Sequence, residues 1–176
     1  VRSYVAFAGG IGVAPVLGSR STDTLSGLGP VPLRAGSRLT LLEAASTPAD
    51  DDPAEPAADT WESLVLRVRL GPRHDWFTLP ARDALLSCAY RLSAKSNRVG
   101  ARLSGDALIR ANAMELPSEG ITVGAVQVPA DGQPLVFLAD HPTTGGYPVI
   151  AVVDRTDLPL LAQARPGATV RFAPWT

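Results

Sequence analysis

Short segments that alternate large apolar and polar residues fill the second half of this chain, with glycine, proline, aspartate or asparagine between them. The clearest is LVLRVRL (residues 64–70), in which each arginine falls between two large apolar residues. Strand side chains point alternately to opposite faces, so this period of two is typical of a strand with one buried face. Comparable short segments follow at AYRLS, ARLSG, GAVQV, PLVFLA, VIAVV and TVRF.

Two segments favour helices. Thr78 is a suitable N-cap for a helix that runs through Ser87, and Thr156 or Asp157 is a suitable N-cap for LPLLAQA, which RPG closes. Many short strands and few helices predict a mainly β fold. Because closing a sheet into a barrel removes its exposed edges, we expect a closed β-barrel with about two short helices.

Residues 46–60, STPADDDPAEPAADT, contain no side chain large enough for a core and predict an extended acidic linker. The linker separates residues 1–45 from a barrel core of residues 61–176. In residues 1–45 we expect strands at SYVAF and RLTLLE, joined by a glycine-rich loop. The chain opens in a strand-like segment without an initiator methionine, so we expect that an N-terminal part is missing.

Charge and composition exclude several classes of partner. The net charge is −1, which provides no overall field for nucleic acid or an anionic membrane. No apolar run approaches the ~18 residues of a membrane-spanning helix. The opening residues lack the charged-then-apolar pattern of a signal peptide, so we expect none. The single cysteine, Cys88, excludes an internal disulfide and fits a reducing compartment. We therefore expect a cytoplasmic protein.

Several common site motifs are absent. The sequence has neither a G-x-x-x-x-G-K-[ST] phosphate loop nor a G-x-S-x-G nucleophile elbow. Two histidines and one cysteine do not make a structural zinc site, so we expect no metal. NAMEL (residues 112–116) is similar to the Ala-Met-Lys-Met site of biotin carriers, but Glu115 stands at the lysine position. This chain therefore has no biotinylation site there.

Residues 9–29 form the first candidate site. Their glycines permit positive φ angles, and the run from Ser19 to Asp23 offers hydroxyl groups, a guanidinium and a carboxylate to an anion or a polar ligand. A long loop whose polar groups bond one another is the alternative interpretation.

The second candidate is SNRVGARLSG (residues 96–105). In a strand through residues 101–104, Arg102 and Ser104 project from the face opposite Ala101 and Leu103. Arg98 lies just outside this strand, beside Asn97. A guanidinium offers five donors in a fixed fork and suits a carboxylate or phosphate. Alternatively, Arg98 or Arg102 pairs with an acid of the same chain.

The third candidate is ADHPTTGGYPVI (residues 139–150), where an apolar run stops and a dense set of polar residues follows. Backbone N–H groups around Thr144, Gly145 and Gly146 are suited to an anion-binding nest. The neighbouring segments supply hydroxyls, a phenol, an acid and an amide from Thr143, Tyr147, Glu119 and Gln127. Asp140 and His141 are candidates for moving protons, since histidine titrates near pH 6.5. A structural loop held by an Asx-turn at Asp140 is the alternative.

Four stretches together resemble the allophanate hydrolase subunit 2 family, also called the KipA family or the family of 5-oxoprolinase C subunits, and placed in the biotin-dependent carboxyltransferase group. They are AFAGGIGVAPVLGSRSTDT, SNRVGARLSG, ELPSEGITVGAVQVPADGQPLVFLADHPTTGGYPVIAVV and RPGATVRF. The resemblance covers nearly the whole chain except residues 46–60. It implies a cyclophilin-like β-barrel, and family members carry a further N-terminal region.

The resemblance also implies partners and an activity. Family members pair with a KipI-like subunit, and the two match the carboxyltransferase region of urea carboxylase. With a third subunit they open 5-oxoproline to glutamate at the expense of ATP, so ATP is expected for the complex. One alternative is a non-catalytic KipA-like partner of a KipI-like kinase inhibitor. Another is a carboxyltransferase component that uses carboxybiotin.

Under the leading interpretation, Arg98 and Arg102 hold a carboxylate or phosphate of a small-molecule substrate. The backbone from Thr143 to Gly146 stabilises an oxyanion, Asp140 or His141 moves a proton, and Tyr147 packs on a planar ring. Amide hydrolysis by a Ser–Ser–Lys set is excluded, because Lys95 is the single lysine and lacks the required serine-glycine motif. Relatives often have a basic residue where this chain has Val149, which suggests either altered specificity or a need for another cation, such as Arg98.

Overall fold

The computed structural model describes residues 4–43 and 62–175. The chain divides into two compact units, one of Ser3–Ala57 and one of Ala58–Thr176 together with Val1–Arg2. The predicted linker, residues 46–60, lies outside the described residues. No helix in the described part of the chain is both long and apolar enough to cross a membrane.

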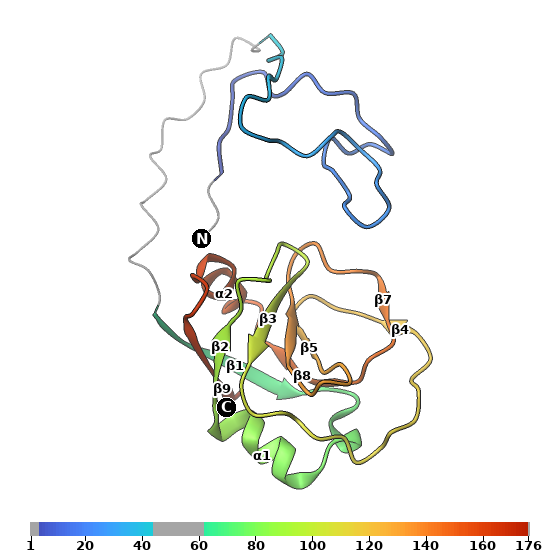
Figure 1. The fold of residues 1–176 in the computed structure, drawn as a ribbon, viewed down its shortest axis with the longest axis vertical. Coiled ribbons are helices and arrows are strands. Elements are labelled where there is room, and N and C mark those ends of the chain that lie inside the picture. The colour runs from blue at the N-terminus through green and yellow to red at the C-terminus, as the bar shows by residue number, and fades with distance from the viewer. Residues whose placement is uncertain (1–3, 44–61, 176) are drawn as a thin grey trace. The chain divides into compact units, whose positions relative to one another are not determined.

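The described residues of the first unit, 4–43, form loops and turns (Figure 1). The strands predicted at SYVAF and RLTLLE are wrong for the described residues of these segments, 4–7 and 38–43. Residues 4–7 form no strand, and Leu41 forms only an isolated bridge, with Ile11. None of the described residues in this unit is buried, and Tyr4 and Leu17 are strongly exposed. Because no face of these segments is buried, strand pairing gains no packing energy, and the apolar segments do not form a sheet.

Residues 62–175 form a closed barrel in which the strand order is β1-β8-β5-β6-β3-β2-β9 (Figure 1). The predicted mainly β fold, a closed barrel with two short helices, is therefore confirmed. The barrel strands are β1 (Ser63–Leu70), β2 (Ala89–Leu92), β3 (Gly100–Ser104), β5 (Ala125–Gln127), β6 (Leu135–Phe137), β8 (Val149–Val153) and β9 (Thr169–Pro174). β1 pairs with β9 in parallel and with β8 antiparallel, which closes the sheet.

The alternation of residue types in the sequence corresponds to the inner and outer faces of the barrel wall. In β1 the apolar positions Leu64, Leu66 and Val68 are buried, whereas Val65 and Arg67 between them and Arg69 after them are exposed. The same alternation in the other strands fills the interior with apolar side chains, among them Tyr90 and Phe172, whose rings lie 5.8 Å apart. Burial of these side chains supplies the main stabilisation of the barrel.

Two helices follow the predicted positions. Helix α1 (Leu79–Ser87) begins after Thr78, whose hydroxyl accepts the backbone N–H of Ala81 at 3.3 Å, as an N-cap does. A short 3-10 helix, η1 (His74–Trp76), precedes it. Helix α2 (Leu158–Gln163) begins after Asp157, which stands at the N-cap position.

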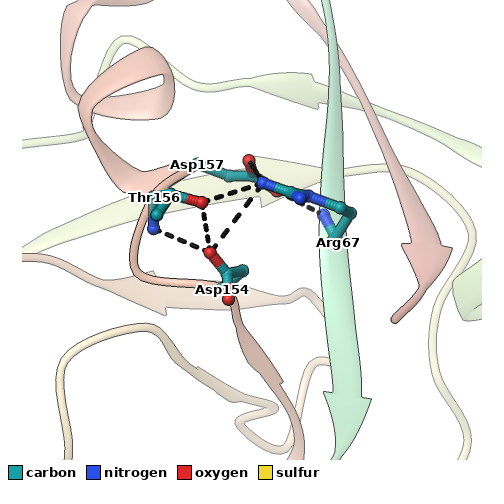
Figure 2. Close-up of polar contacts among 4 residues, drawn as sticks. All are labelled: Arg67, Asp154, Thr156 and Asp157. Carbon is teal, nitrogen blue, oxygen red and sulfur yellow. Dashed lines mark hydrogen bonds and ion pairs between the residues drawn. The ribbon is translucent and has the colours of Figure 1, made fainter. Parts of the chain in front are cut away.

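The capping role predicted for Thr156 or Asp157 is wrong, because neither side chain caps α2. Figure 2 shows that the Asp157 carboxylate instead faces Arg67 of β1. Its Oδ1 lies 2.6 Å from Arg67 Nη2, and its Oδ2 accepts from the Arg67 backbone N–H at 2.8 Å. These bonds join the start of α2 to the barrel wall and hold the pKa of the Asp157 carboxyl below its usual range.

Two short strands stand apart from the barrel sheet. β4 (Glu119–Gly120) and β7 (Thr144–Gly145) pair antiparallel, with Glu119 opposite Gly145 and Gly120 opposite Thr144. They lie side by side at one edge of the barrel (Figure 1). This pairing brings the segment around Glu119 against the TTGG segment, as the candidate site requires.

Candidate functional site

The outer face of β3, β6 and β5 carries a row of side chains that the sequence singled out only in part. The strand register places Arg102 opposite Leu135, Leu135 opposite Gln127, and Gln127 opposite Val149. Neighbouring strands are about 4.8 Å apart, so the Cα atoms of Arg102 and Gln127 are separated by about 10 Å. Arg102 is exposed and Gln127 is buried, so the row runs from an open cation to a covered amide.

A small apolar cluster lies beside this row, on the same outer face of the sheet. Ala125, Phe137 and Val149 are its buried members. Val99 and Ile121, from the segments next to Arg98 and Gly120, pack against it. The cluster therefore draws two loops distant in sequence toward the same outer face of the sheet.

Gln127 is the buried polar side chain of this face, 2% exposed. Its Nε2 donates to the backbone carbonyl of Tyr147 at 2.9 Å. A Cβ atom on Gly145 would lie 2.7 Å from the same nitrogen, so β7 crosses directly over the amide. A buried amide with its nitrogen fixed in this way keeps one orientation, which suits it to position a ligand.

Arg98 and Asp140 join the other two predicted segments at the edge of the sheet. Arg98 Nε lies 2.7 Å from Asp140 Oδ2, and both side chains are about half exposed. The backbone supports the pair, since Leu138 N–H donates to the Val99 carbonyl and Asp140 N–H to the Arg98 carbonyl. Asn97 Oδ1 accepts the N–H groups of Val99 and Gly100, which fixes the turn before β3.

His141 follows this ion pair, half-buried beside Phe137, with ring centroids 6.4 Å apart. Its Nδ1 lies 2.8 Å from the Pro142 carbonyl oxygen. A carbonyl only accepts hydrogen bonds, so Nδ1 carries the proton. In the neutral ring Nε2 is then the basic nitrogen, and it is the atom able to take a proton from a ligand.

Glu119 is held by Arg73, a residue that the sequence did not single out. The Arg73 guanidinium donates through both Nε and Nη2 to the two carboxylate oxygens, and it lies 5.7 Å from the Trp76 ring. The hydrogen bonds from Arg73 lower the pKa of the Glu119 carboxyl below its ordinary value. Glu119 is therefore an anchored anion that fixes β4 rather than a proton donor.

Arg110 is the second residue that the sequence did not single out. Its guanidinium carbon lies 5.9 Å from the Tyr147 ring centroid, and its Nη2 donates to the Val128 carbonyl at 2.9 Å. Its Nε is the one buried side-chain nitrogen or oxygen without a hydrogen-bond partner in the described part of the chain. Both Arg73 and Arg110 stand alone in segments without a motif, so no local signal distinguishes them.

The nest predicted around Thr144, Gly145 and Gly146 is not formed. Thr144–Gly145 form strand β7. A nest needs right-handed and left-handed residues in alternation, but neither Gly145 nor Gly146 has a positive φ. Ile121 N–H donates to the Thr143 carbonyl, which extends the pairing by one residue. These residues position Gly145 over Gln127, whereas Thr144 and Tyr147 remain exposed.

The alternatives left open for the arginines have different outcomes. Arg98 pairs with an acid of the chain, Asp140, but at the surface rather than inside the barrel. Arg102 has no carboxylate within 4.0 Å among residues 4–43 and 62–175, and its backbone N–H donates to Ser96 Oγ. As predicted, it shares the exposed face of β3 with Ser104.

The glycine-rich loop of the first unit bonds within itself. Arg20 Nε donates to the Val13 carbonyl, Thr22 Oγ1 to the Pro30 carbonyl, and the Asp23 carboxylate accepts from Leu25 N–H and Ser26 Oγ. This is the alternative stated for residues 9–29. One N–H group of Arg20 and the hydroxyl groups of Thr22 and Ser26 are thus engaged within the loop.

Comparison with known proteins identifies the family. Residues 1–174 match the carboxyltransferase domain, subdomain A and B, so this chain belongs to the carboxyltransferase domain family. The chain is similar to the C subunit of 5-oxoprolinase from Escherichia coli, with 39% identity over 98% of this chain and 56% of that protein. It thus spans little more than half the length of that relative.

Solved structures agree with this assignment. The protein named TTHA0988 is 41% identical, with a TM-score of 0.74, over 94% of this chain and 31% of that one. The urea carboxylase of Kluyveromyces lactis is 28% identical, with a TM-score of 0.75, over 96% of this chain and 17% of that one. The predicted resemblance to the family of 5-oxoprolinase C subunits and to the carboxyltransferase region of urea carboxylase is confirmed.

Proposed function

We propose that this chain is part of a 5-oxoprolinase-type enzyme complex and that it binds a small substrate with a lactam or ureido amide. The site is the outer face of β3, β6 and β5. The observation that carries the proposal is the row in which exposed Arg102 stands two strands from buried Gln127, beneath Gly145. Family membership and the likeness to the C subunit of 5-oxoprolinase support the substrate class.

The roles of the side chains follow from their surroundings. Arg102 has no carboxylate partner among the described residues, so its guanidinium is available for a substrate carboxylate. The Leu135 side chain lies between Arg102 and Gln127 and offers an apolar contact to the body of a small ring. Gln127 lies beneath β7 at the covered end of the row. With its nitrogen fixed by the Tyr147 carbonyl, it positions the β7 backbone next to the amide end of the substrate.

Proton transfer is assigned to His141. Its Nδ1 is bonded to the Pro142 carbonyl, which leaves Nε2 as the proton acceptor. Asp140, in its ion pair with Arg98, positions the preceding loop and supplies a negative charge beside the histidine. This division of roles makes Asp140 a positioning residue and His141 the proton carrier.

An amide is a poor electrophile because resonance delocalises its nitrogen lone pair. ATP, used elsewhere in the complex, would supply the activation that this chain's residues do not. A KipI-like subunit and a third subunit are the partners of the proposed complex. The share of this chain is then to bind, orient and protonate or deprotonate the substrate.

A second function is favoured by one specific finding. The whole match is to a carboxyltransferase domain, and the fold is shared with a urea carboxylase. A carboxyltransferase component would use the same outer face for a urea-like or lactam nitrogen, with the carboxyl group delivered from carboxybiotin. Since Glu115 stands where a biotin carrier has its lysine, the biotin would belong to another protein.

The test is activity of the assembled complex with substitutions in this chain. We expect Arg102→Gln to raise KM for 5-oxoproline at least about tenfold, since a charged hydrogen bond to the carboxylate is lost. His141→Ala should lower kcat while KM changes little. Arg155→Gln, in the exposed turn before α2, serves as the control and should leave both constants unchanged.

Three outcomes separate the proposals. If Arg102→Gln and His141→Ala both have the kcat and KM of the wild type, the outer face takes no part in the mechanism. Turnover that requires a biotinylated carrier and bicarbonate favours the carboxyltransferase function. Assembly with a KipI-like protein but no turnover of 5-oxoproline, urea or allophanate favours a regulatory role.

A further inference from the structure

A cleft lies on the barrel surface where β1, β2 and β9 are neighbours, beside the turn that joins α2 to β9. Its volume is about 550 Å³, within the range of small-molecule sites. The residues that line it and matter here are Glu62, Ser63, Arg91, Arg165, Gly167 and Thr169. They come from the start of β1, from β2, and from the turn that joins α2 to β9.

Strand register gathers three of these polar side chains in a line. Arg91 of β2 stands opposite Thr169 of β9, and Thr169 stands opposite Ser63 of β1. A guanidinium and two hydroxyl groups thus lie side by side on adjacent strands. The backbone beneath them is already paired, since Thr169 N–H donates to the Glu62 carbonyl.

The Arg91 guanidinium is positioned by one bond. Its Nη1 donates to the Gly167 carbonyl at 3.0 Å, which ties it to the turn that carries Arg165. Neither Arg91 nor Arg165 has a carboxylate within 4.0 Å in the described ranges. Two uncompensated guanidinium groups therefore meet at one cleft.

The number of donors decides the class of ligand. Each arginine has five N–H groups, of which one in total is used, and the two hydroxyls add two more. A phosphate monoester offers three terminal oxygens and a charge near −2, and so matches this set better than a carboxylate does. The Glu62 carboxylate repels such a ligand. Because two guanidinium groups line the same cleft, the net charge there is still positive.

We propose that Arg91, Arg165, Ser63 and Thr169 form a binding site for the phosphate group of a small phosphorylated molecule. The site lies one strand away from Arg102 on the same outer side of the sheet, since Arg91 stands opposite Ser104 of β3. It shares no residue with the proposed substrate face, and nothing in the proposed function requires it. It gives the chain a second ligand, with the phosphate held between strands β2 and β9 and the turn at Gly167.

The experiment is a titration of the isotope-labelled 176-residue chain with inorganic phosphate at constant ionic strength, followed by ¹H–¹⁵N spectra that include arginine Nε–H signals. We expect saturable shifts at Arg91, Arg165 and Gly167. Arg91→Gln and Arg165→Gln should each weaken the affinity at least about tenfold. Glu62→Gln should tighten it about threefold, because a repelling charge is removed.

Two controls keep the result specific. Arg155→Gln removes an exposed arginine outside the cleft and should leave the affinity unchanged. Acetate should bind more weakly than phosphate. Equal phosphate affinity in the wild type and in both arginine variants would overturn the inference, as would a loss with Arg155→Gln as large as that with Arg165→Gln. Shifts confined to the Arg102 face would overturn it too.

Discussion

Arg98 Nε and Asp140 Oδ2 lie 2.7 Å apart and join the loop before β3 to the loop after β6. The two residues are distant in sequence, and the pairing of β3 with β6 brings their backbones together. The ion pair therefore completes a contact that the sheet has already made. Its role is to fix the position of the His141 loop rather than to hold the barrel closed.

If the ion pair has this role, its loss should change stability little and activity strongly. Because both side chains are about half exposed, Arg98→Gln and Asp140→Asn should each change the free energy of unfolding by less than about 1 kcal/mol. Activity of the assembled enzyme should fall at least about tenfold in each, with a double-mutant cycle reporting coupling in activity. A large loss of stability with unchanged activity would assign the pair to folding alone.

Gly145 and Gly146 form a matched pair for testing how β7 covers Gln127. A Cβ at Gly145 would lie 2.7 Å from Gln127 Nε2 and 3.2 Å from the Ile121 side chain, whereas one at Gly146 has its nearest neighbour 3.5 Å away. Gly145→Ala should therefore cost about 1–3 kcal/mol of stability, because Gln127 and Ile121 must shift. Gly146→Ala should stay within about 0.5 kcal/mol.

Chemical denaturation of the two variants measures this difference directly. If Gly145→Ala and Gly146→Ala proved equally stable, β7 would not pack on Gln127 in the way described.

The bonds between Arg67 and Asp157 predict a dependence of stability on pH. The folded-state pKa of Asp157 is lowered, chiefly by the hydrogen bonds from Arg67. The stabilisation is therefore fully present above the unfolded pKa, near 3.9, and is lost as the pH falls through the folded value. Asp157→Asn should cost about 1.5–3 kcal/mol at pH 7, and the difference from wild type should shrink below about pH 4.

Asp154→Asn is the control for this prediction. Asp154 Oδ1 is 3.9 Å from Arg67 Nη2, and asparagine keeps the acceptor that the Thr156 N–H uses (Figure 2). Its effect should be smaller at every pH. A difference between wild type and Asp157→Asn that stays constant from pH 7 to pH 3 would contradict the assignment.

Much of the barrel was predictable because its cause is local. The period of two in residues 64–70 follows directly from one buried and one exposed face. Strands at SYVAF and RLTLLE were predicted from equally apolar segments and did not form, because strand formation depends on a partner face that local sequence does not report. Likewise, the Asp157 side chain does not cap α2 but bonds to Arg67, a residue 90 positions away in the sequence.

The candidate site was predictable only as separate pieces. Sequence pattern indicated that Arg102 faces outward, but the register that places it in a row with Gln127 depends on how three strands pair. The two-residue strands β4 and β7 are too short to produce a periodic pattern in the sequence. Their pairing therefore could not be predicted, and the TTGG segment forms a strand where a nest was expected. Arg73 anchors Glu119 through a contact between distant segments, which no motif encodes.

The most direct measurement is a crystal structure of the proposed 5-oxoprolinase-type complex with 5-oxoproline bound. The account predicts the substrate carboxylate within hydrogen-bonding distance of the Arg102 guanidinium, with the lactam ring over Leu135 and its amide toward Gln127. A substrate bound elsewhere, with the outer face of β3, β6 and β5 left to solvent, would contradict it.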